Sequence, residues 1–316
     1  MPSQDEKTEL AATAGGLIPV LVWGIALPIV RILQSHIGLL RLFGIVFSVA
    51  AVFGLLEQRV RGRLRPRTQV FQNPLLYGRW LFFALHEVCV CVAVSTVRLE
   101  YVPLVILINY LWPTATIVFS IMLAGTVATR RWAIALGSLI VIASLSFEIL
   151  SGVRVSPDMF ASRGDLRAYA LALVGALSWG LYGALTRRGG DAAGGSAVLP
   201  FFQLTFAAAL PLSLVPAFYV PMELSIPGAM FLALYCVLQF FAYLCWDRGM
   251  RVGNVVILSL FADFIPWLSL LSAHGFLLIQ IKSTTVISAI ALVCGAVVTR
   301  YGTMQVGLSG RARNQS

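Results

Sequence analysis

Rings with polar tips recur at helical spacing inside the most apolar parts of the chain. Residues three, four or seven apart share one face of a helix, and this spacing joins Tyr235, Gln239 and Tyr243. Neighbouring apolar segments contribute residues of the same kind, namely Trp23, Asn109, Tyr110, Trp112, Trp179 and Tyr182. Polar groups facing lipid are costly, so these rows of residues along one helix face, here called stripes, should face the protein interior. There, rings could stack on a flat hydrophobic substrate and contact an ammonium group.

Interfacial anchoring is the alternative role for such rings, because Trp and Tyr are enriched where the membrane meets water. That role accounts for the aromatic residues near the ends of apolar segments, which are Trp80, Trp132, Trp246 and Tyr301. It accounts poorly for the deeper Tyr110, Trp112, Trp179 and Tyr243. We therefore expect the deeper set to line a binding site.

Two carboxyl groups, Glu87 and Asp263, lie near the middle of apolar segments. A carboxyl group in such surroundings is protonated or paired, which makes both residues candidate proton carriers or ammonium partners. The alternative is a neutral acid bonded to a neighbouring helix. His86 adjoins Glu87 but points about 100° away around a helix, so we expect a structural role for it.

Three arginines, Arg31, Arg41 and Arg98, lie near the opposite ends of their segments from most other cations. They could extend to the membrane interface, or hold a substrate carboxylate at the outer mouth. A phosphorylated substrate fits the chain poorly, because no central Lys or Arg is available to pair with a phosphate.

Enzyme motifs were sought and are incomplete. His86-Glu87 lacks a second His four residues on, and the glycine-rich run from Gly189 to Gly195 has no following Gly-Lys-Ser/Thr. Cys89 and Cys91 diverge by about 200° on a helix and cannot share a metal or a disulfide. We therefore expect no enzyme activity, no metal, no cofactor and no direct use of ATP, although a membrane enzyme or a scaffold remains an alternative.

The composition places most of the chain in lipid. Of its 316 residues, 59% are hydrophobic and 11% are charged, against about 25% charged in soluble domains. The net charge of +10 would suggest nucleic acid in a soluble protein. Here the arginines flank apolar runs, which indicates control of membrane topology and no nucleic-acid partner.

Ten apolar runs are long enough to span a bilayer as helices, since a span needs about 20 residues. They lack the alternation of barrel strands. The predicted spans are 10–33, 37–56, 79–97, 102–124, 132–150, 167–187, 198–219, 227–246, 252–277 and 283–301.

Positive charge predicts that both termini are cytoplasmic. With that orientation, 16 of the 23 Lys and Arg residues lie inside and 7 lie outside. The largest contributor is the segment from Glu57 to Arg67, which has five arginines at alternate positions. An anionic-lipid or nucleic-acid patch is the alternative role for that segment.

The chain repeats itself at an interval of about 155 residues. Trp23-Gly24 recurs as Trp179-Gly180, an offset of 156, and Pro113 recurs as Pro266, an offset of 153. Each copy holds five spans, and an odd number inverts the second copy in the membrane. We predict two inverted repeats, 1–150 and 151–301, followed by a cytoplasmic tail, 302–316. Chance similarity among apolar helices is the alternative.

Pro113 and Pro266 should interrupt the fourth and ninth spans. Proline removes a backbone donor and frees a carbonyl one turn earlier, which membranes tolerate beside protein or a water-filled cavity. Paired breaks in corresponding spans point to the substrate site of a transporter. A simple packing kink is the alternative.

The string Asn109-Tyr110-Leu111-Trp112-Pro113, together with ten spans in two halves, resembles the EamA branch of the drug/metabolite transporter superfamily, and within it the bacterial aromatic amino acid exporters of the YddG type. The span pattern covers nearly the whole chain, although the second half has no copy of the string. The resemblance implies a basket-shaped ten-helix fold in the bacterial inner membrane. It also implies export of aromatic amino acids and bulky amphipathic compounds through a central cavity.

The function we predict is secondary transport, by alternating access, of aromatic amino acids or similar small amphipathic metabolites out of the bacterial cell. The predicted substrate-binding residues are Trp23, Asn109, Tyr110, Trp112, Pro113, Trp179, Tyr182, Gln239, Tyr243, Asp263 and Pro266, with Glu87 and Asp263 as candidates for coupling to protons or ions. Transport of another small metabolite is the alternative. The predicted partners are a small-molecule substrate and the lipid bilayer, and the sequence leaves the oligomeric state open.

Overall fold

Helices make up all the regular structure in the residues that the computed structural model describes, which are 4–61, 73–123, 125–155, 162–189 and 199–303. In chain order the longer helices are α1 (Gln4–Gly15), α2 (Ile18–Ile37), α3 (Leu39–Val60), α5 (Pro74–Thr96), α6 (Val102–Asn109), α7 (Trp112–Leu123), α8 (Arg131–Val155), α9 (Arg163–Gly189), α10 (Leu199–Leu204), α11 (Ala209–Leu212), α12 (Ile226–Val252), α13 (Val255–Ala262), α14 (Ile265–Leu277) and α15 (Ser283–Tyr301). Most of the predicted arginine-rich segment, most of the glycine-rich run and most of the tail lie outside these ranges.

Eight helical stretches in the described residues are long and apolar enough to cross a membrane. They correspond to eight of the ten predicted spans and confirm an all-helical membrane protein. The other two predicted spans, 198–219 and 252–277, form shorter helices. In the first of them α10, a 3₁₀ turn and α11 follow one another, and Pro211 contributes to the irregularity because its nitrogen cannot donate to the preceding turn.

The predicted breaks in the fourth and ninth spans are confirmed, and they match each other. α6 ends at Asn109 and α7 begins at Trp112, while α13 ends at Ala262 and α14 begins at Ile265. Each proline is the second residue of the helix after the break. The first turn of a helix has no internal partner for its N–H groups, so proline costs nothing there.

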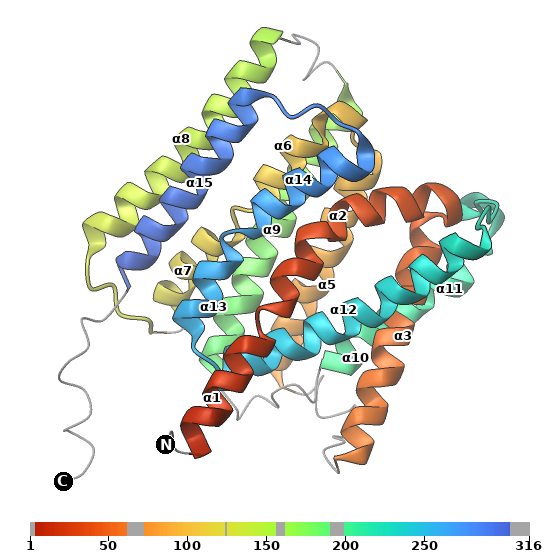
Figure 1. Cartoon of the computed structure of the whole chain (residues 1–316), viewed down its shortest axis with the longest axis horizontal. Coiled ribbons are helices and arrows are strands. Elements are labelled where there is room, and N and C mark those ends of the chain that lie inside the picture. The colour runs from red at the N-terminus through yellow and green to blue at the C-terminus, as the bar shows by residue number, and fades with distance from the viewer. Residues whose placement is uncertain (1–3, 62–72, 124, 156–161, 190–198, 304–316) are drawn as a thin grey trace.

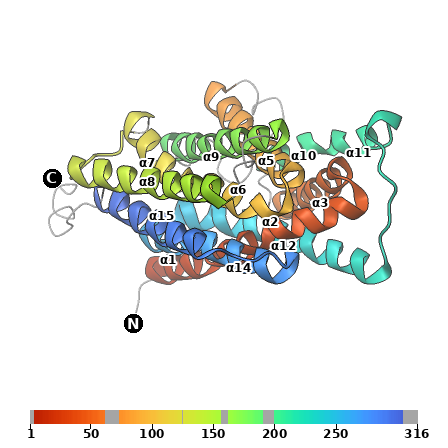
Figure 2. The same ribbon diagram turned by 90° about the horizontal axis from the view of Figure 1, so that it is seen from above.

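Two groups of helices flank a central set (Figures 1 and 2). α8 and α15 pair along their length at one end of the molecule, and α3 with α10 and α11 lies at the other. Between them α9 packs on α5 and α7, and α2 packs on α12 and α14. α1 begins and α15 ends at the same side of the bundle (Figure 1). The segments that carry the predicted site therefore meet in the middle.

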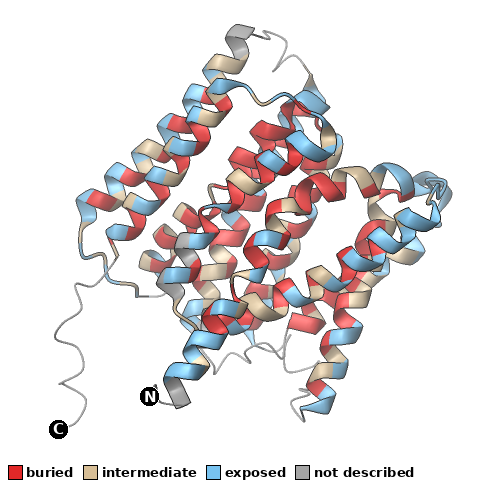
Figure 3. Ribbon diagram, in the orientation of Figure 1, coloured by how far each residue is buried: buried red, intermediate tan, exposed pale blue. Residues whose placement is uncertain are grey.

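The outer helices bury one face and expose the other (Figure 3), and the exposed face of α8 carries apolar side chains where a soluble protein would carry polar ones. Along α8 the exposed side chains include Leu136, Leu139 and Leu150, while its polar Ser144 and Glu148 are buried. Glu148 accepts hydrogen bonds from Thr285, at 2.6 Å, and Ser288, at 3.3 Å, across the contact with α15. Polar groups satisfied inside and leucines outside are the arrangement that a lipid solvent requires.

Candidate substrate cavity

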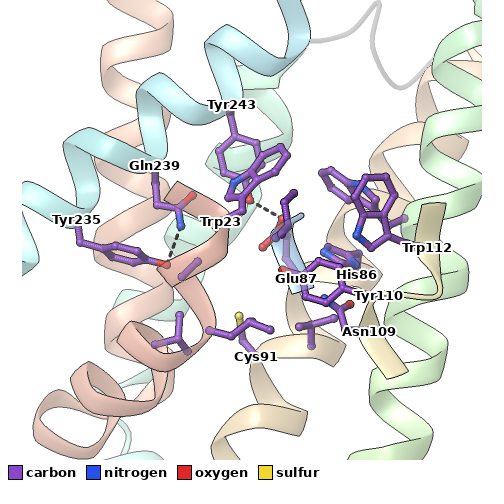
Figure 4. Close-up of a pocket in the computed structure, with 16 residues that line it drawn as sticks. Trp23, His86, Glu87, Cys91, Asn109, Tyr110, Trp112, Tyr235, Gln239 and Tyr243 are labelled. Carbon is purple, nitrogen blue, oxygen red and sulfur yellow. Dashed lines mark hydrogen bonds between the residues drawn. The ribbon is translucent and has the colours of Figure 1, made fainter. Parts of the chain in front are cut away.

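A cavity of about 600 Å³ lies where the central helices meet. Its lining comes from α2, α5, α6, α9 and α12, and from the residues at the two helix breaks (Figure 4). The described lining residues are Trp23, Ala26, Leu27, Val30, His86, Glu87, Val90, Cys91, Asn109, Tyr110, Trp112, Trp179, Tyr235, Gln239, Tyr243 and Ile265.

Three tryptophans form one wall of the cavity and contact each other edge to face. The ring of Trp179 lies 5.9 Å from Trp23 and 6.4 Å from Trp112, centroid to centroid, with interplanar angles of 87° and 80°. Trp23 also contacts Tyr243, at 5.6 Å, and Trp246, at 5.2 Å. Such contacts stabilise rings by about 0.5–1.5 kcal/mol beyond their area term. The wall is therefore a connected set of rings that can hold another flat ring.

Polar groups on the wall are paired with one another. Tyr243 donates a 2.5 Å hydrogen bond to Oε1 of Glu87, and Gln239 donates from Nε2 to the hydroxyl of Tyr235 at 2.7 Å (Figure 4). The hydroxyl of Tyr110 lies 3.0 Å from that of Ser269 on α14, which ties the break in the fourth span to the ninth. These bonds hold the polar side chains in one arrangement around the cavity.

Glu87 lies at the centre of this arrangement. It is 9% exposed and is the sole carboxyl group among the described lining residues, none of which is Lys or Arg. The cavity therefore presents one acidic group among rings, in agreement with the predicted position of Glu87 near the middle of its span.

The expectation that His86 faces away from the cavity is wrong. Its Nδ1 lies 2.9 Å from the backbone oxygen of Gly175, and its ring lies 4.6 Å from Trp179. A carbonyl oxygen only accepts, so Nδ1 carries the hydrogen. The cavity is wide enough that two consecutive residues of α5 both reach it, because α9 closes on one side of α5 and α2 on the other.

Of the predicted site residues, seven line the cavity: Trp23, Asn109, Tyr110, Trp112, Trp179, Gln239 and Tyr243. Glu87 joins them. Tyr182 lies behind the wall, 4.9 Å from Trp179 and 5.7 Å from Phe83. Pro113 and Pro266 do not line the cavity, but the helices that they begin present Trp112 and Ile265 to it.

Asp263 is not brought to the cavity. Its carboxylate forms a two-pronged ion pair with Arg300 of α15, at 2.7 and 3.1 Å, and the residue is 2% exposed. The sequence places these residues 37 positions apart on separate helices, so their pairing had no local signal. The pair joins the break in the ninth span to α15.

Of the three arginines considered for a substrate carboxylate, Arg31 and Arg98 bond to protein groups, while Arg41 contacts a ring and its Nη1 has no hydrogen-bond partner among the described residues. Arg31 donates to the backbone oxygens of Val94 and Ser95 at the end of α5. Arg98 pairs with Asp165 at 2.6 Å, and the guanidinium of Arg41 lies 5.7 Å from the ring of Tyr219. In this arrangement Arg31 and Arg98 hold helix ends together, which differs from the possible role in binding a substrate carboxylate.

Several lining residues were missed by the sequence reasoning because they carry no polar group. Ala26, Leu27 and Val30 follow Trp23 by three, four and seven positions, and Val90 and Cys91 follow Glu87 by three and four. Extending each stripe by helical spacing would have found them. These side chains make their part of the cavity lining apolar.

A second cavity of about 320 Å³ adjoins the first. It is lined by apolar residues of α2 and α3, among them Phe43 and Phe47, and it shares Glu87, Gln239 and Tyr243 with the first cavity. Glu87 thus stands between an aromatic space and an apolar one.

Known proteins resemble the chain over most of its length. Residues 166–301 match the sequence model of the EamA-like transporter family. The aromatic amino acid exporter YddG of Salmonella typhimurium is 27% identical over 274 residues, which cover 83% of this chain and 87% of the relative. YddG of Escherichia coli K12 is 27% identical over 277 residues, with the same coverage.

A solved crystal structure shares the fold, with a TM-score of 0.66 over 95% of this chain and 99% of its own, at 22% identity. The family and the two exporters are membrane transporters and not enzymes. This chain is therefore a multi-pass membrane protein with a cavity at the centre of its helices, similar in residues 166–301 to the EamA-like transporter family and over most of its length to the two YddG exporters.

Proposed function

We propose that the protein is a secondary transporter that exports aromatic amino acids or similar small amphipathic metabolites across the bacterial inner membrane by alternating access. The observation that carries the proposal is the cavity, whose lining combines three tryptophans with one carboxyl group. Stacking on the rings suits a flat apolar group, and the carboxyl suits an ammonium. The name of the two YddG relatives, aromatic amino acid exporter, agrees with this chemistry.

Alternating access requires two halves that can exchange roles, and glycine contacts support an inverted repeat. A Cβ added to Gly24 would lie 2.5 Å from Cβ of Leu268, and one added to Gly180 would lie 2.8 Å from Cβ of Ala115. Leu268 and Ala115 each follow the break proline of their span by two residues. Each Trp-Gly pair thus packs on the broken helix of the opposite half.

These two contacts suggest how the cavity could open to either side. Glycine lets two helices approach closely, and such contacts pack membrane helices tightly. We propose that the helix contact at Gly24 loosens while the contact at Gly180 stays packed, and the reverse, so that the two halves move as rigid bodies about the substrate. Glu87 is then the coupling candidate, since Asp263 is held by Arg300.

The proposal is tested by flux in reconstituted liposomes. We expect the wild-type protein to move labelled aromatic amino acids, and Trp112→Ala to slow their flux about 2- to 10-fold, because loss of one ring contact weakens binding by about 0.5–1.5 kcal/mol. Trp132→Ala is the matched control, since Trp132 is 61% exposed and lines no described cavity. If Trp112→Ala transports at the wild-type rate, the tryptophans only pack the helices and do not bind the substrate. If the wild-type protein moves other metabolites but no aromatic amino acid, its substrate is a different metabolite.

The proposed orientation has its own test. The described chain begins and ends at one side of the bundle, and the count of positive charges assigns that side to the cytoplasm. A reporter that is active only in the periplasm should be silent when fused after Arg313 and active when fused after Pro157. The opposite pattern would invert the topology and exclude cytoplasmic termini.

A further inference from the structure

The described lining of the cavity includes an acidic side chain but no Lys or Arg, which affects whether the ammonium or the carboxylate of a substrate is recognised. Glu87 supplies the one carboxyl group that can pair with a cation, whereas none of the described lining residues of either cavity is Lys or Arg. Oε1 of Glu87 accepts from Tyr243, and the hydrogen bonds of the described residues leave the other oxygen, Oε2, for a ligand. An amino acid carries an ammonium and a carboxylate. Among the described lining residues, Glu87 can pair with the ammonium, and no cationic side chain can pair with the carboxylate.

The neutral polar groups add acceptors to the same wall. Oδ1 of Asn109 and Oε1 of Gln239 have no hydrogen-bond partner among the described residues, and both side chains are 5% exposed. His86 gives its Nδ1 hydrogen to Gly175, so neutral His86 adds an acceptor at Nε2. A buried acceptor without a donor is costly, and an N–H donor of a ligand would relieve that cost.

We infer that the cavity binds singly charged aromatic amines, which lack a carboxylate, more tightly than the corresponding zwitterionic amino acids, with Glu87 as the residue that sets this preference. The inference rests on the proposed function and narrows its substrate class. An ammonium beside Glu87 is compensated by charge and by the faces of the tryptophans. A buried carboxylate would meet only neutral donors such as indole N–H groups, and burying an unpaired charge is costly.

The adjoining cavity gives such an amine room for its apolar part. Glu87 borders both spaces, so an ammonium beside it can direct a ring toward the tryptophans or an apolar group toward Phe43 and Phe47. The positive group remains at one place while the apolar group varies. This arrangement selects for a cation with an apolar body and does not require a second charge.

The test is a binding comparison with three ligands that share an indole ring. Isothermal titration of the purified full-length protein in detergent would use tryptamine, which has only the ammonium, tryptophan, which has both charges, and indole-3-propionate, which has only the carboxylate. We expect tryptamine to bind at least 10-fold more tightly than tryptophan, and indole-3-propionate not to compete with either. In Glu87→Gln the ratio of the two affinities should fall toward one.

Glu148→Gln is the matched control, because Glu148 is also a buried carboxyl in a spanning helix but lines neither of these cavities. Its ligand ranking should equal that of the wild type. Equal or tighter binding of tryptophan, or competition by indole-3-propionate, overturns the inference and leaves the proposed function in place. If none of the three ligands binds, the proposed function fails and the inference with it. The wild-type ranking decides even if Glu87→Gln does not fold.

Discussion

Arg300→Met is expected to lower the free energy of unfolding by about 3–5 kcal/mol, because it leaves the carboxylate of Asp263 buried without its partner. Both residues are buried, and two hydrogen bonds of 2.7 and 3.1 Å join them. Asp263→Asn should also destabilise the protein, since it leaves the guanidinium of Arg300 without a counter-charge. The measurement is thermal or denaturant-induced unfolding of the purified variants in one detergent.

The pair is isolated by a double-mutant cycle. Asp263→Asn combined with Arg300→Gln removes both charges and keeps polar groups in contact, so the double variant should be more stable than Asp263→Asn alone or Arg300→Gln alone. Arg61→Met is the matched control for loss of an exposed pair. Arg61 lies 2.6 Å from Glu57, but its side chain is 49% exposed, and such pairs contribute about 0–1 kcal/mol. Equal losses in Arg300→Met and Arg61→Met would show that the buried pair contributes no more than a surface one.

Gly180→Ala is expected to cost about 1–3 kcal/mol of stability, through overpacking of a tight helix contact. The added Cβ would lie 2.8 Å from Cβ of Ala115 and 3.0 Å from the backbone nitrogen of Thr116. α9 and α7 must then separate, which displaces Trp179 and Trp112 in the wall of the cavity. We therefore expect a lower unfolding midpoint together with slower flux.

Gly275→Ala controls for the general effect of a methyl group in a helix. A Cβ at Gly275 meets no atom within 4 Å, and alanine is the better helix former by about 0.8–1.0 kcal/mol. The unfolding midpoint of Gly275→Ala should stay level or rise. If Gly180→Ala behaves in the same way, the close approach of α9 to the broken helix is not what holds these segments together.

Much of the site was accessible from spacing alone. Tyr235, Gln239 and Tyr243 fall on one face of any helix, and that face does line the cavity. The breaks were also indicated, because Pro113 and Pro266 each remove a helical hydrogen bond at matching places in the two halves, although α2 continues through Pro28. In both cases the evidence lies within one helical segment.

The expectations that the structure changed concern residues whose role depends on contacts with another helix. His86 seemed to face away because helical geometry gives its angle only relative to Glu87, and not how wide a gap α2 and α9 leave along α5. Asp263 was expected to be a carboxyl group available to substrate or protons, because no residue near it in the sequence indicates its ion pair with Arg300. Arg31 and Arg98 seemed available to a substrate until the backbone oxygens and Asp165 beside them were known.

The apolar runs were enough to predict a helical chain in lipid, because backbone groups in a bilayer must be satisfied within each segment and the length of a run therefore decides whether it forms a helix. The sequence by itself also determined which spans break and which faces carry rings. Tertiary structure decided which charges remain free: it paired Asp263 with Arg300 and left Glu87 between two cavities. The physical reason is that charge compensation acts over a few ångströms between helices that are far apart in sequence, so it appears only when the helices pack.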